Sequence, residues 1–252
     1  MRDPQTLALR PCSARRKALP YRVMPLDCQH VRRHNRFCEM GVAKPVVDPN
    51  WFRNLWGTGF HDPREWSWLA QLGSDVDFLA TFGCMSSEPF FLMWLLDAAM
   101  VRTVEKDPKY ISEREEEEEH LRKNASTAFE GRDIKFILAD MTELNEETLP
   151  SGRFDLAFCK AVLYQIFLAD LEGVQGEVGT QQIKEALQVV LKAICQMARV
   201  VKPGGLVIAI ESIAVNAGEE PTPIGPLFEI AGLRPEPIQG APQDAYCYRK
   251  PG

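Results

Sequence analysis

Residues 77–107 hold the pattern that most constrains how this chain can fold. An apolar run ends in a turn at Gly83-Cys84, and an apolar stretch of helical character begins at Glu88. A second apolar run then ends in Glu105. The order strand, tight turn, helix, strand and acid is typical of a βαβ unit, in which a helix joins two parallel strands.

Such a unit is one half of a nucleotide-cofactor site. The turn after the first strand receives the cofactor, and an acid after the second strand bonds a ribose hydroxyl. Gly83 suits the turn because glycine allows a sharp bend and close approach of a ligand. Glu105 suits the ribose because one carboxylate can accept from both hydroxyls. The alternative for Glu105 is a helix-capping or surface acid, whereas Asp107 is expected to be the N-cap of the next helix.

Short apolar segments alternate with helical segments through the rest of the chain. Helices are predicted from residue 108, over 181–201 and over 226–231, and a loop or short helix over 160–167. The predicted strands are 78–81, 101–104, 134–141, 154–159, 206–210, 234–238 and 245–249, with a turn at 202–205. This alternation predicts an α/β fold, a Rossmann-like three-layer sandwich with a mostly parallel seven-stranded sheet. The last two strands are linked too closely for a crossover helix, so they should form an antiparallel C-terminal hairpin.

Composition divides the chain into three regions. Residues 1–46 show no periodicity and are predicted to be a basic, disordered tail, since nine Lys/Arg stand against three acids in the first forty positions. Residues 47–76 contain four of the five tryptophans and are predicted to form one or two helices, either as core packing or as a lid. Residues 77–252 form the predicted cofactor-binding domain.

Charge and cysteine usage narrow the functional classes. The formal net charge is −6 although the tail is basic, so the body is acidic, which argues against a broad nucleic-acid-binding face. The tail leaves contact with RNA, a membrane or a partner open. No apolar run approaches the ~20 residues needed to span a bilayer.

The seven cysteines are irregularly spaced and fall largely in apolar runs. This usage is typical of a reducing cytosol and predicts a cytoplasmic protein.

Two further patterns are expected to be without catalytic chemistry. Cys28, His30, His34 and Cys38 have a spacing that a zinc site could use, but no second ligand pair follows at a suitable distance and arginines surround them. The five glutamates at 115–119 are predicted to be a solvated helix face. We therefore expect no metal site.

The motifs, taken in order, resemble the class I methyltransferases that use S-adenosylmethionine (SAM). The resemblance covers about Asp77 to Lys250. It is carried by the turn 81–87, Glu105, the pair Asp140-Met141, the strand 154–159, residues 162–165, the turn 201–205 and the terminal hairpin. The resemblance implies that Glu105 bonds the ribose, that Asp140 and Met141 lie at the adenine ring, and that Gly83 and Cys84 line the methionine portion of SAM.

The turn at 81–87 departs from the usual family pattern. Thr81 stands where the family has an acid, and Met85 and Ser87 stand where it has glycines. Glu88 is placed to supply the missing carboxylate from the start of the following helix. Thr81 and Glu88 are accordingly among the predicted cofactor-binding residues.

The acceptor side carries fewer signals. Lys160 and Tyr164 follow the fourth strand, at the edge where the family places its acceptor. We assign Lys160 to the cofactor. Tyr164 is the candidate catalytic group, and the alternative is that its ring only packs in the core. We expect a SAM-dependent methyltransferase acting on a small molecule, of undetermined oligomeric state. The alternative, favoured by the divergent turn, is a catalytically silent binding or scaffold protein that has lost SAM use.

Overall fold

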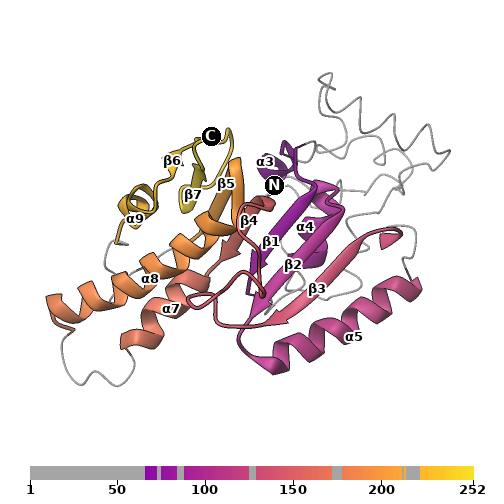
Figure 1. Cartoon of the computed structure of the whole chain (residues 1–252), viewed down its shortest axis with the longest axis horizontal. Coiled ribbons are helices and arrows are strands. Elements are labelled where there is room, and N and C mark those ends of the chain that lie inside the picture. The colour runs from indigo at the N-terminus through magenta and orange to yellow at the C-terminus, as the bar shows by residue number, and fades with distance from the viewer. Residues whose placement is uncertain are drawn as a thin grey trace, which may run out of the picture.

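Alternating strands and helices build one sheet with helices on both of its faces (Figure 1). The computed structural model describes residues 66–72, 75–83, 88–124, 129–171, 178–211, 213 and 222–252. In chain order the elements are α3 (Ser67–Ala70), β1 (Phe78–Phe82), α4 (Glu88–Leu96), β2 (Met100–Glu105), α5 (Pro108–Asn124), β3 (Asp133–Leu138), β4 (Phe154–Lys160), α7 (Val162–Leu171), α8 (Thr180–Val200), β5 (Val201–Ile210), α9 (Gly225–Ile230), β6 (Arg234–Pro235) and β7 (Ala245–Arg249).

The described strands form a seven-stranded sheet in the order β3-β2-β1-β4-β5-β7-β6. The pairs β3-β2, β2-β1, β1-β4 and β4-β5 are parallel. Strand β7 lies between β5 and β6 and runs antiparallel to both. The predicted mostly parallel sheet with a C-terminal antiparallel hairpin is therefore confirmed.

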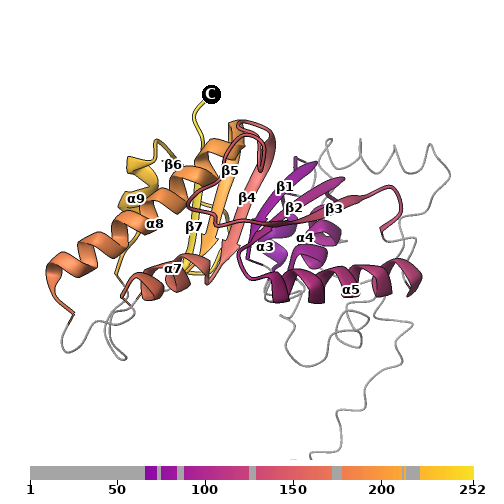
Figure 2. The same cartoon turned by 60° about the horizontal axis from the view of Figure 1, so that its bottom comes forward.

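Each central strand contributes to two cores because successive side chains point to opposite faces of the sheet. Leu79, Leu156 and Ile208 pack with α3, α4 and α5, whereas Ala80 and Ala157 pack with α7, α8 and α9. Figure 2 shows the two sets of helices on either side of the strands. These near-continuous apolar strands are what a parallel sheet covered on both faces requires, and they confirm the three-layer sandwich.

The strand order reverses between β1 and β4. From β1 the chain builds outward through β2 and β3, then returns to β4 and continues in the other direction to β5. Helices α4 and α7, which follow β1 and β4, pack on opposite faces of the sheet. Ligands of open α/β sheets bind at such a reversal of strand order. Phe82 pairs with Cys159 in register, so Gly83 and Lys160 are the next residues along the two strands.

A buried acid joins the opposite, amino edge of the same two strands. Asp155 near the start of β4 is 6% exposed, and its Oδ2 accepts from the backbone N–H groups of Asp77 (2.8 Å) and Phe78 (2.7 Å). The Lys202 ammonium forms an ion pair with the other carboxylate oxygen. One side chain thus fixes where β1 begins relative to β4 and β5.

Two predicted strands are shorter in the structure, and one predicted turn is part of a strand. Strand β6 stops at Pro235 because Pro235 and Pro237 have no N–H to donate to the ladder. Strand β3 ends at Leu138, before Asp140 turns the chain. The predicted turn at 202–205 is a bulge within β5, as pairing with β4 shifts in register across it. The segment over 160–167, predicted as a loop or short helix, contains the start of the ten-residue helix α7.

The basic tail, the Cys28–Cys38 segment and most of the Trp-rich segment lie outside the described residues. Within the Trp-rich segment, Trp66 and Trp68 are each 3% exposed and pack in the core with α4. These two side chains therefore follow the core-packing alternative.

None of the described helices is long and apolar enough to cross a membrane. Across the described ranges, no group of three or more His, Cys, Asp or Glu is arranged to hold a metal ion.

Asp155→Ala should destabilise the protein by about 2 kcal/mol, because two buried backbone N–H groups lose their acceptor. The free energy of urea unfolding measures this loss. Glu119→Ala is the control: its ion pair with Lys123 joins side chains that are 71% and 68% exposed, so the urea midpoint should hardly move. Equal effects of the two substitutions would contradict the anchoring role of Asp155.

Candidate functional site

Four neighbouring strands bring four of the predicted site residues to one edge of the sheet. Gly83 follows β1, Glu105 ends β2, Asp140 follows β3 and Lys160 ends β4. The Gly83 N–H donates to the carbonyl oxygen of Val104 (2.8 Å), which extends the ladder of β1 and β2 to the edge. These four residues therefore lie at the carboxyl ends of the strands next to the reversal between β1 and β4.

Gly83 meets two conditions that exclude a side chain. Its φ of 83° lies in the left-handed region that favours glycine. A Cβ placed on it would lie 2.7 Å from Cγ2 of Val162, the first residue of α7. Gly83 therefore rests directly on the start of α7.

Glu105 is held at the edge by the backbone that follows it. The residue is 9% exposed, and its Oε1 accepts from the N–H groups of Lys106 (2.8 Å) and Asp107 (3.0 Å). Asp107 in turn caps α5, since its Oδ1 accepts from the N–H of Lys109 (2.9 Å); its predicted N-cap role is confirmed. The Glu105 carboxylate is thus oriented by its own loop.

Thr81 lies inside the sheet rather than at its edge. It is 2% exposed, and its hydroxyl shares a hydrogen bond of 2.7 Å with the hydroxyl of Thr103, its register partner on β2. The structure does not group Thr81 with the edge residues, because its hydroxyl is committed to the pairing of β1 with β2.

Glu88 and Lys160 connect the start of α4 with the end of β4. Their charged groups lie 3.3 Å apart, and their side chains are 18% and 23% exposed. The Lys160 ammonium also lies 5.3 Å from the centroid of the Trp66 ring, within range of a cation–π interaction. The structure therefore brings these two predicted residues together and adds Trp66, which the sequence indicated only as part of a Trp-rich segment.

Asp140 and Met141, predicted to lie at an adenine ring, have different surroundings. Asp140 is exposed, and its Oδ1 accepts from both the N–H and the hydroxyl of Thr142, each at 2.8 Å. Met141 is 6% exposed and packs in the core beside α7 and α8. Asp140 is thus a polar group at the edge, while the Met141 side chain belongs to the core beneath it.

The start of α7, which carries Tyr164, is held by an acid to which the sequence gave no role. Glu211 follows β5 and is 2% exposed. Its Oε1 accepts from the N–H groups of Val162 (2.8 Å) and Leu163 (3.0 Å), and its Oε2 accepts from the N–H of Tyr164 (3.1 Å). Burial raises the pKa of the Glu211 carboxyl, and these three N–H groups offset part of that rise. The sequence signal was an acid placed directly after a run of apolar residues.

Two further residues complete this corner. Ala161, between β4 and α7, has a φ of 54°, a left-handed conformation that costs a non-glycine residue roughly 1–2 kcal/mol. Burial raises the pKa of the Cys159 thiol well above its usual range, and the Glu211 charge adds to the shift, so the thiolate form of Cys159 is disfavoured.

Two predicted site residues remain. Tyr164 is half-buried in the first turn of α7, and Cys84 lies outside the described residues.

Comparison with known proteins gives matches at the level of structure. No family model and no curated protein matches the sequence. Among solved structures, the N-methyltransferase NodS from Bradyrhizobium japonicum WM9, in complex with S-adenosyl-L-homocysteine (SAH), superposes with a TM-score of 0.51 and 15% identity over 82% of this chain and 94% of NodS. The sugar N-methyltransferase KedS8 from Streptoalloteichus sp. ATCC 53650 superposes with a TM-score of 0.52 and 13% identity, over 82% of this chain and 94% of KedS8.

This chain has the fold of the class I SAM-dependent methyltransferases. In that fold, ligands of open α/β sheets bind where the strand order reverses, which here lies between β1 and β4. We call the carboxyl ends of β1, β2, β3 and β4 the strand-end edge. The same edge carries Gly83, Glu105, Asp140 and Lys160.

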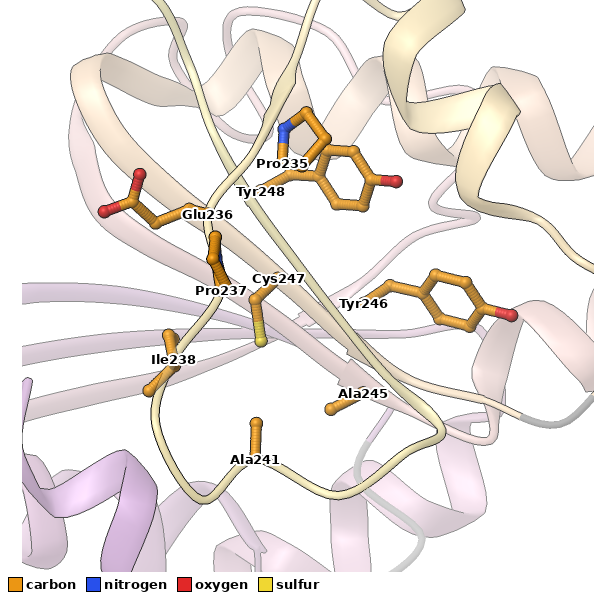
Figure 3. Close-up of a pocket in the computed structure, with 9 residues that line it drawn as sticks. All are labelled: Pro235, Glu236, Pro237, Ile238, Ala241, Ala245, Tyr246, Cys247 and Tyr248. Atoms are coloured by element: carbon orange, nitrogen blue, oxygen red, sulfur yellow. The ribbon is translucent and has the colours of Figure 1, made fainter.

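A cavity of about 370 Å³ lies elsewhere, along the C-terminal hairpin (Figure 3). The Cys247 sulfur points toward Ile238 and Ala241, while the Tyr246 and Tyr248 rings extend to the other side of β7. None of the described site residues lines it; its lining is Pro235, Glu236, Pro237, Ile238, Ala241, Ala245, Tyr246, Cys247 and Tyr248. The strand-end edge, not this cavity, holds the polar groups that the fold and the sequence both indicate.

Thr81→Val and Thr103→Val should each destabilise the protein by about 1–2 kcal/mol, since each leaves the partner hydroxyl buried without its hydrogen bond. The double variant should lose clearly less than the sum of the two single losses, because both hydroxyls are then gone. Urea unfolding of the four proteins measures the coupling, and strictly additive losses would contradict it.

Gly83→Ala should cost more stability than Gly131→Ala. Both glycines have positive φ, at 83° and 70°, but a Cβ on Gly131 would meet nothing within 4 Å. The difference in unfolding free energy therefore reports the contact with Val162. Adding Val162→Ala should rescue Gly83→Ala in part, whereas no rescue would mean that the two residues are not in contact.

Proposed function

We propose that this protein is a SAM-dependent methyltransferase that transfers a methyl group to a small-molecule acceptor. The observation that carries the proposal is the gathering of Gly83, Glu105, Asp140 and Lys160 at the ends of four adjacent strands, beside the reversal of strand order. The fold shared with NodS and KedS8 supports it.

The residues at this edge match the parts of SAM. The Glu105 carboxylate would accept from the ribose hydroxyls, and the exposed Asp140 from the adenine amino group. Gly83 lacks the Cβ that would collide with Val162, so its backbone can turn closely around the methionine portion. The Lys160 ammonium would face the methionine carboxylate, with Glu88 and Trp66 holding it in place.

The chain's own contribution to the reaction is mainly alignment. SAM supplies a methyl group bound to a positively charged sulfur, and this sulfonium sulfur is already an activated leaving group. The chain must hold donor and acceptor in line, and a substantial part of the rate enhancement comes from such positioning. Tyr164, in the first turn of α7, is the candidate group for orienting the acceptor or its proton.

A small molecule is the acceptor class that the observations favour. KedS8 is a sugar N-methyltransferase and NodS an N-methyltransferase, so an amino group on a small molecule is the first acceptor to screen. The net charge of −6 disfavours a polyanionic substrate such as RNA or DNA.

Isothermal titration with SAH, the stable product of SAM, tests the proposal. The wild-type chain should bind SAH with micromolar affinity. Glu105→Ala should weaken binding by roughly tenfold to a hundredfold, since hydrogen bonds to a charged group contribute about 1.5–3 kcal/mol. Glu105→Gln keeps an oxygen for the Lys106 and Asp107 N–H groups and should still lose affinity.

Glu229→Ala serves as the matched control. Glu229 is an exposed acid on α9, outside the group at the strand-end edge, and its loss should leave SAH binding unchanged. Circular dichroism checks that all variants are folded. A folded wild-type protein without affinity at millimolar SAH would contradict the proposed function and favour a silent scaffold.

A further inference from the structure

The start of α7 is capped by a side chain from a distant part of the chain, directly after β5. The residue before α7 is Ala161, which has no side-chain oxygen, so the first N–H groups of the helix lack a local acceptor. Glu211, from the end of β5, accepts from Val162, Leu163 and Tyr164 instead. A carboxylate is also the favourable charge at a helix N-terminus.

The same first turn supports the predicted cofactor turn. Val162 bonds Glu211 through its N–H and places its Cγ2 against Gly83. Gly83 in turn donates to Val104, the residue before Glu105. A continuous line of contacts therefore runs from the buried acid on β5 to the edge residues of β1 and β2.

We propose that Glu211 is a positioning residue of the site: its carboxylate fixes the first turn of α7, so that Val162 holds the Gly83 backbone at the end of β1 in place while Tyr164 is kept on the acceptor side. This inference rests on the proposed function. One acid, buried in the core, would then set the placement of the cofactor side relative to the acceptor side.

The burial of Glu211 supports a role beyond filling space. An isolated carboxylate is costly to bury, and an apolar residue would fill the same volume without that cost. The three backbone donors compensate for the burial only while α7 begins where it does, directly after the left-handed Ala161. The carboxylate therefore favours one placement of α7 over others.

Asp155 provides a matched control at the other edge of the sheet. It is also a buried acid, and it also accepts from two backbone N–H groups, those of Asp77 and Phe78. Glu211→Gln, Glu211→Ala and Asp155→Asn should all lower the melting temperature. Only the Glu211 variants should change the predicted site.

Two measurements on the full-length chain separate positioning from stability. Hydrogen exchange of the ligand-free proteins should be faster in the peptides covering 79–83 and 162–171 for Glu211→Gln, and unchanged there for Asp155→Asn. Titration with SAH should show about tenfold weaker binding for Glu211→Ala, as expected if the binding-competent placement of Gly83 falls to about a tenth of the population. The loss should be smaller for Glu211→Gln, and affinity should stay within about twofold of wild type for Asp155→Asn.

The outcomes are distinct. Unchanged SAH affinity in folded Glu211 variants, or exchange in 79–83 that does not respond, would overturn the inference and leave Glu211 as a structural cap. Equal losses in the Asp155 and Glu211 variants would also overturn it. If the wild type binds no SAH, the proposed function fails and the positioning role fails with it, while the exchange result still shows whether Glu211 controls the turn at Gly83.

Discussion

The pairing of β1 with β4 is the interaction on which the site depends. These parallel neighbours stand where the strand order reverses, so the chain leaves their carboxyl ends in different directions. Gly83 and Lys160 are next to each other only because Phe82 and Cys159 are paired. A slip of one residue would turn every side chain of β1 to the opposite face and exchange the residues that β1 contributes to the two cores.

Two buried acids act at opposite edges of this part of the sheet. Asp155 accepts from the first residues of β1 at the amino edge, and Glu211 accepts from the first turn of α7 at the carboxyl edge. Both sets of hydrogen bonds join segments far apart in the sequence, which the apolar cores alone would hold less specifically, since hydrophobic contact has no direction. The cores supply most of the stabilisation, and each acid selects the geometry at its own edge of the sheet.

Much of the fold and part of the site could be predicted because their signals are local. Runs of apolar residues with Gly83, Asp107 and Gly204 at their boundaries indicated the strands and the helix starts, and Glu105 stood out as an acid at a strand end. Thr81 shows where local reasoning stops. Its position matched a binding motif, but its hydroxyl bonds Thr103, and only the register of β1 with β2 decides that.

The sequence by itself determined the order of elements, the two-sided burial of the strands and the presence of polar residues at their ends, because alternation and turn residues act over a few positions along the chain. The tertiary structure alone decided that Lys160 meets Glu88 and Trp66, that Val162 lies against Gly83, and that Glu211 caps a helix about fifty residues earlier. Such contacts join distant segments through sheet order and side-chain packing, which no local pattern encodes.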